Sequence, residues 1–176
     1  TRGLIEPTLG ELADGRLLMV MRGSNAPGGE LPGTKWAAWS DDGGQTWDAP
    51  RPWTYDDGEA FFSPSACSQL AGMPDGRLLW VGNICEHNPR GNSPRYPLVV
   101  GEVDRGTGLL RRASVGVVDD RAAEESPHLT LSNFLVRPDR ADGSLALHMT
   151  RLFAGARDHN PPDFTADATV YRIVVY

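Results

Sequence analysis

The sequence predicts an all-β fold made of three similar units of antiparallel strands. Three observations support this prediction. No stretch of the 176 residues has sustained helical periodicity, the 20 glycines and 14 prolines are spread among short apolar runs, and a hairpin motif recurs about every sixty residues. An apolar content of 40% with 23% charged residues is ordinary for a globular chain.

The hairpin motif is the pentapeptide DGRLL. It occupies residues 14–18 and 75–79, and a relative, DGSLAL, occupies 142–147. Each copy has an apolar segment on either side: IEPTLGEL and RLLMVMR in the first unit, SPSACSQLAG and RLLWVGNI in the second, LTLSNFLV and SLALHMT in the third. A tight turn between two apolar segments is typical of a β-hairpin, so each copy predicts two paired strands.

A third strand is expected in every unit, from the segments TKWAAWS, RYPLVVGEV and DATVYRIVVY. Repeated antiparallel units of this size predict the blades of a β-propeller, because each blade buries its faces only against its neighbours. The approximate blades are residues 1–57, 58–122 and 123–176. Three blades are half of a six-bladed ring, so we expect the missing half from the rest of the protein or from a second copy.

The stretch SDDGGQTW, residues 40–47, is rich enough in polar side chains to raise the question of a calcium loop. As a turn it needs no ligand, because Asp42 can accept hydrogen bonds from the amides after it while Gly43 and Gly44 allow positive φ. A calcium loop counted from Asp42 requires glutamate at its twelfth position, where the sequence has Trp53. We therefore predict a structural turn, and expect no metal and no cofactor.

The charge balance limits the partners. The formal net charge is −6, which argues against a nucleic-acid surface, and no apolar run is long enough to cross a membrane. Lys35 is the single lysine, so the basic residues are nearly all arginines, which suit planar anions such as carboxylates. We expect neither nucleic acid nor membrane as a partner. Localisation is weakly constrained, with a secreted or periplasmic protein slightly favoured over a cytoplasmic one.

The two cysteines, Cys67 and Cys85, flank the second hairpin turn. They are expected to face each other roughly across that hairpin. A disulfide is sterically conceivable, and two free thiols are the alternative.

The pattern Ser40-x-Asp42-x-Gly44-x-Thr46-Trp47 resembles the Asp-box of the sialidase-like six-bladed propellers, also called the bacterial neuraminidase (BNR) repeat. In that family the box is a structural turn on the outer rim, away from the sugar site. The resemblance implies the C-terminal half of such a propeller. It also implies a glycoside hydrolase whose substrate is an acidic or related sugar at a glycan end.

A longer match lies in EPTLGELADGRLLMVMR, residues 6–22, which is similar to a sialidase segment that begins with a catalytic glutamate and ends with an arginine. The resemblance implies that Glu6 acts as base toward a tyrosine nucleophile, and that Arg22 and Arg95 belong to the arginine triad that binds the substrate carboxylate. Two plainer interpretations stay open. Glu6 and Arg22 can form an ion pair across one hairpin, and Arg95 can be a solvated residue at the start of a strand.

The sequence departs from the family at the nucleophile, because no tyrosine lies between Pro97 and Val170. Leu131 falls nearest the expected place, His128 is the closest group able to exchange protons, and His87 is expected to line the same mouth. We therefore predict a sialidase-like glycoside hydrolase with atypical catalytic residues. The alternative is a non-catalytic carbohydrate-binding or scaffold propeller.

Overall fold

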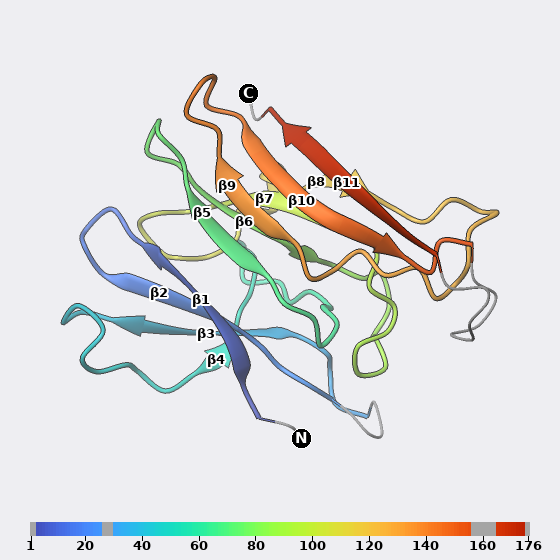
Figure 1. Cartoon of the computed structure of the whole chain (residues 1–176). Helices are drawn as coiled ribbons and strands as arrows, with labels where there is room; N and C mark the ends of the chain where they lie inside the picture. The colour runs from blue at the N-terminus through green and yellow to red at the C-terminus, as the bar shows by residue number, and fades with distance from the viewer. Residues whose placement is uncertain (1–2, 26–29, 156–164, 175–176) are drawn as a thin grey trace.

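The structure is a computed structural model that describes residues 3–25, 30–155 and 165–174. Three antiparallel sheets follow one another along the chain and lie side by side (Figure 1). The all-β prediction is confirmed, with a single short 3-10 helix, η1 (Arg112–Ser114), among the described residues.

Each sheet is a meander in which consecutive strands pair. The first sheet contains β1 (Ile5–Glu11), β2 (Leu17–Arg22), β3 (Lys35–Ser40) and β4 (Arg51–Pro52). The second contains β5 (Gln69–Gly72), β6 (Leu78–Asn83), β7 (Leu98–Val103) and β8 (Gly116–Asp119). The third contains β9 (Leu135–Pro138), β10 (Leu145–Leu152) and β11 (Ala166–Ile173).

The repeated Asp-Gly turn closes the first hairpin of each sheet in the same way. In the first copy, Asp14 Oδ1 accepts the backbone N–H of Arg16 at 3.1 Å, and Gly15 has a φ of 87°. In the second copy, Asp75 accepts from Arg77 at 3.0 Å. A short acceptor side chain followed by glycine suits this turn, because glycine adopts positive φ without steric cost.

The stretch at residues 40–47 is also a turn that bonds to itself. Asp42 Oδ1 accepts the N–H of Thr46 at 2.9 Å and the hydroxyl of Ser40 at 2.8 Å, and Asp42 Oδ2 accepts the Thr46 hydroxyl at 2.6 Å. These hydrogen bonds, above all those from Thr46, lower the pKa of Asp42 to about 2. Both carboxylate oxygens of Asp42 are therefore hydrogen-bond acceptors within the turn.

Two apolar layers hold the three sheets together, and β6 contributes to both. Leu78 and Trp80 of β6 pack toward the first sheet, whereas Leu79 and Val81 pack toward the third. All six residues of β6 are buried. A strand covered on both faces is expected for the middle blade of a stack.

The outer faces of the first and third sheets lack such a cover among the described residues. Leu9 on the first sheet is 54% exposed, and on the third sheet Leu135 and Val170, which both pair with His148 across the strands, are 57% and 64% exposed. Exposed apolar side chains on the two end faces are what three blades without neighbours would present.

The first strand of each sheet lies innermost, with β1 against β5 and β5 against β9 (Figure 1). In an antiparallel meander, the start of the first strand, the end of the second and the start of the third lie together along one edge of the sheet, which is formed by strand ends and not by an outer strand. We call this edge the site edge. Glu6, Arg22 and Lys35 lie on it in the first sheet.

Candidate functional site

The predicted pair Glu6 and Arg22 is in direct contact. Arg22 Nη1 lies 2.7 Å from Glu6 Oε1, and Arg22 Nε donates to Ser65 Oγ at 2.8 Å. The Arg22 side chain is 13% exposed and the Glu6 side chain 42%. Glu6 has a φ of 53° and lies where the register of β1 against β2 shifts, and a bulge of this kind redirects a side chain at a sheet end. The hairpin places both residues at the site edge, and the carboxylate that contacts Arg22 belongs to the residue at the bulge, Glu6.

Arg95 is half-buried just before β7, where its Nε donates to the carbonyl of Asn92 at 3.1 Å. Burial lowers the pKa of Arg95, the positive charge of Arg22 lowers it further, and Cys67 and Glu6 raise it. Arg95 is thus electrostatically coupled to the Glu6–Arg22 pair. Two guanidinium groups that repel each other in a partly buried place have the charge and the donor groups that suit an anion.

Cys67 and Asn133 lie at the heads of the other two inner strands. Cys67 Sγ accepts the backbone N–H of Asn133 at 3.3 Å and lies 3.7 Å from Asn133 Oδ1. Sequence reasoning missed both residues as site candidates. The repeat contains the signal, because Glu6 precedes Asp14 of its turn by eight residues and Cys67 precedes Asp75 by the same number.

Lys35 lies beneath this cluster with an exposed fraction of 0%. Its Nζ donates to the carbonyl of Pro64 at 3.3 Å and to that of Ala66. Burial lowers the pKa of Lys35 to about 7, and the neighbouring positive charge of Arg22 acts in the same direction. The sequence identifies Lys35 as the single lysine of the chain, but no pattern in the sequence indicates that its side chain is buried.

The other residues predicted from the sequence, Leu131, His128 and His87, lie in different surroundings. Leu131 is fully buried in the apolar layer between the second and third sheets, and its N–H donates to the Arg95 carbonyl at 3.0 Å. His128 is half-buried on the loop before β9, where its N–H donates to Ser126 Oγ at 3.1 Å. His87 is exposed on the loop after β6. The structure brings Glu6, Arg22 and Arg95 together in one cluster.

The cysteines are both free, so the disulfide that the hairpin would allow is absent. Cys85 is buried, and its thiol lies 3.8 Å from the carbonyl of Pro94 and 3.7 Å from that of Tyr96. Burial raises the pKa of the Cys85 thiol to about 11. Trp53 is fully buried, with Nε1 donating to Gly108 O at 2.8 Å, so its ring is not available to a sugar.

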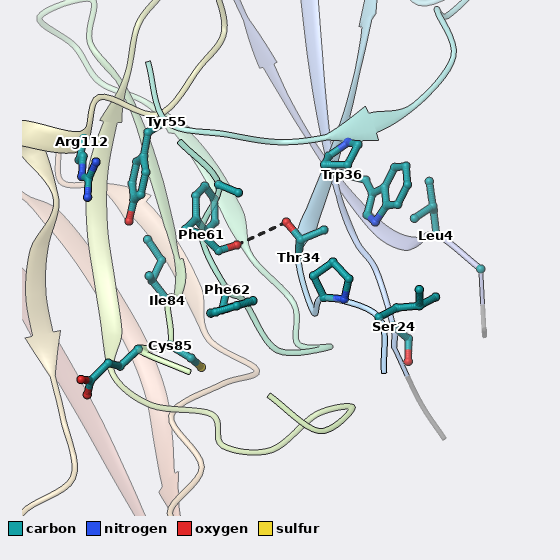
Figure 2. A pocket seen from close by; sticks show the side chains of 16 residues that line it. Leu4, Ser24, Thr34, Trp36, Tyr55, Phe61, Phe62, Ile84, Cys85 and Arg112 are labelled. Atoms are coloured by element: carbon teal, nitrogen blue, oxygen red, sulfur yellow. Dashed lines mark hydrogen bonds between the residues drawn. The ribbon is translucent and has the colours of Figure 1, made fainter. Parts of the chain in front are cut away.

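The structure also contains a groove of about 1000 Å³ (Figure 2). Its lining is mainly apolar and aromatic, with Trp36 on one side and Tyr55 beside Arg112 on the other. Leu4 and Ser24 of this lining are two residues from Glu6 and Arg22 in the chain. The groove offers mainly apolar contact surface, and its Arg112 is paired with Asp57 at 3.0 Å. The candidate charged groups for an anion are therefore those of the Glu6–Arg22–Arg95 cluster.

Within the described ranges, no three histidine, cysteine, aspartate or glutamate side chains gather as a metal site. Nor does this part of the chain contain a helix with the length and apolar character to cross a bilayer.

Comparison with known proteins agrees with this architecture. Solved structures with the same fold include a GH43_12 enzyme from a capybara gut metagenome (TM-score 0.57, 13% identity), a xylan β-1,4-xylosidase from Bacillus halodurans C-125 (0.53, 14%) and a leech intramolecular trans-sialidase (0.50, 17%). The alignments cover 97%, 96% and 93% of this chain but only 28%, 28% and 23% of those chains. No curated protein matches the sequence.

These likenesses define the chain as a partial β-propeller, which confirms the predicted fold class. The model of the BNR repeat-like domain matches residues 1–115. The chain therefore belongs to the BNR repeat-like domain family, and the family predicted from the turn motif and from the segment at residues 6–22 is confirmed.

Proposed function

We propose that this chain supplies half of the sugar site of a sialidase-like glycoside hydrolase that acts on acidic or related terminal sugars of glycans. The observation that carries the proposal is the contact between Glu6 and Arg22, with Arg95 electrostatically coupled to both. Membership of the BNR repeat-like domain family supports a role connected with glycans.

The cluster suits a sugar carboxylate for three reasons. A guanidinium group is planar, keeps its charge and can donate two parallel hydrogen bonds to a carboxylate. Ser65 and Glu6 hold Arg22 in one orientation, so little side-chain freedom remains to be lost on binding. An anion placed between Arg22 and Arg95 would also remove the repulsion that contributes to the low pKa of Arg95.

Catalysis in this proposal uses atypical residues. Sialidases employ a tyrosine nucleophile, and tyrosine needs a nearby carboxylate to take its proton. Glu6 is the carboxylate of the cluster and His128 is the other candidate for proton transfer. The nucleophile, the remaining binding groups and the missing blades would come from the rest of the protein or from a second copy.

The test is calorimetric binding of a panel of sialic acids, uronic acids and neutral sugars, with the complete ring used where an upstream half exists. Selective binding of an acidic sugar that is lost in Arg22→Ala and Arg95→Ala would support the proposal. Arg51→Ala is the matched control, because Arg51 lies on β4 with a side chain that is 62% exposed. If a complete ring binds no acidic sugar, the family relationship concerns the fold alone.

A non-catalytic carbohydrate-binding or scaffold propeller is the second candidate. It is favoured by the contacts of the tyrosines in the described chain: Tyr171 donates to Asp119, Arg121 lies over the ring of Tyr96, and Arg112 lies over the ring of Tyr55. Glu6→Gln separates the two candidates. Turnover should collapse in an enzyme, whereas a binding protein should keep its affinity within a few-fold.

A further inference from the structure

Lys35 is a buried amine placed directly behind the arginine cluster. Its Nζ donates to two backbone carbonyls, Pro64 and Ala66, and in the described part of the chain no carboxylate bonds to it. Burying an ammonium without a carboxylate partner is costly, so such a group is rarely kept for packing alone.

The two carbonyls belong to the segment that orients Arg22. Ser65 lies between Pro64 and Ala66, and its Oγ accepts from Arg22 Nε at 2.8 Å. Lys35 therefore holds the backbone on both sides of the side chain that holds Arg22. The path from Nζ to the guanidinium group passes through this short segment.

Charged and titratable groups from several elements act electrostatically on Lys35. Cys67 at the head of β5, Arg22 on β2, Glu6 on β1 and Cys85 after β6 all influence its pKa, which burial brings to about 7. At neutral pH the amine is thus close to the point at which it gains or loses a proton. A negative charge added to the cluster would favour the protonated form.

We propose that Lys35 is a positioning residue of the arginine cluster, and that a carboxylate binding at Arg22 and Arg95 is accompanied by protonation, from solvent, of those molecules in which the Lys35 amine is neutral. This inference rests on the proposed acidic-sugar site. It adds that the site binds its anion together with a proton, so that affinity falls as pH rises.

The composition of the chain makes Lys35 directly observable, since it is the single lysine. In protein labelled with lysine carrying ¹³C at the ε position, one side-chain resonance reports its titration. We expect a midpoint near neutral pH in the wild type, a lower midpoint in Glu6→Gln and a higher midpoint in Arg22→Met, because these variants remove a negative and a positive neighbour respectively. A midpoint at the ordinary lysine value, or one that neither variant moves, would overturn the proposal without any ligand being involved.

The ligand-dependent arm uses acetate, the simplest planar carboxylate, and then N-acetylneuraminic acid. Acetate should raise the midpoint by about one pH unit in the wild type, and by linkage bind about tenfold more tightly at pH 6 than at pH 9. Lys35→Met should remove this pH dependence, and Cys67→Ser should retain it, which excludes titration of the neighbouring thiol. Calorimetry in two buffers of different ionisation enthalpy should detect the proton taken up.

The two proposals fail in different ways. If acetate moves the midpoint in the wild type but not in Arg22→Met, and no acidic sugar binds, the coupling stands and the proposed sugar function fails. If neither carboxylate moves the Lys35 midpoint, or Lys35→Met keeps the full pH dependence, the coupling is wrong.

Discussion

Replacing Lys35 by methionine should change how the stability of the protein depends on pH. The pKa of Lys35 is about 7 in the folded chain, compared with 10.5 for an ordinary lysine. Between these two values the unfolded chain binds one more proton than the folded chain, so the free energy of unfolding rises with pH in this window. Methionine is similar in length, cannot titrate and removes this contribution.

The magnitude follows from the two pKa values. The limiting slope is about 1.4 kcal/mol per pH unit, and it is about half developed at pH 7, where the folded-state amine is half protonated. From pH 7 to pH 9 the wild type should therefore gain about 2 kcal/mol relative to Lys35→Met. Cys85 acts in the opposite direction as pH approaches 9, because its pKa is raised to about 11 from 9.0, but it is present in both proteins and cancels in the comparison.

The assay is urea unfolding followed by tryptophan fluorescence, at pH 7, 8 and 9, for the wild type and Lys35→Met. The stability at any one pH is not decisive, because the variant also loses two hydrogen bonds and gains apolar packing. The difference in slope is decisive. Parallel pH profiles for the two proteins would show that Lys35 keeps an ordinary pKa and would refute the reasoning.

Two further predictions concern the sheets and the thiols. Arg151→Met should lower the free energy of unfolding by about 2–3 kcal/mol, which urea unfolding measures. Asp119 and Glu125 lie 2.7 and 2.5 Å from the Arg151 guanidinium group. In the variant they would lose the cation that links the edge of the second sheet to the third. Iodoacetamide should label Cys67 faster than Cys85 in the folded protein, because Cys67 is half-buried, while Cys85 is buried with a pKa of about 11; peptide mass spectrometry measures the two rates.

The control for Arg151 is Arg51→Ala, which removes an exposed pair with Asp48 and a contact over the Trp39 ring and should change stability by less than about 1 kcal/mol. Equal losses in the two variants would contradict the role given to Arg151. For the thiols, labelling of Cys85 at the same rate as Cys67 would contradict the burial of Cys85, unless the protein were unfolded under the labelling conditions, which far-UV circular dichroism would detect.

The amino-acid sequence by itself determined the repeating architecture. The Asp-Gly turns are local, since an acceptor side chain and a glycine a few atoms apart suffice to form them, and their recurrence with apolar flanks predicted the three sheets. The proximity of Glu6 and Arg22 was also predictable from the sequence, because both residues belong to one hairpin whose length sets their separation.

Only the tertiary structure decided what surrounds that pair. Lys35 becomes a buried amine because a segment some thirty residues later folds over it, and no local pattern signals that cover. Cys67 meets Asn133 across the junction of two sheets, and Leu131 is buried in the core beneath that junction. Turns depend on neighbours along the chain, whereas the burial and charge of a site depend on which blades pack together, and packing between distant segments is not encoded in any short stretch of sequence.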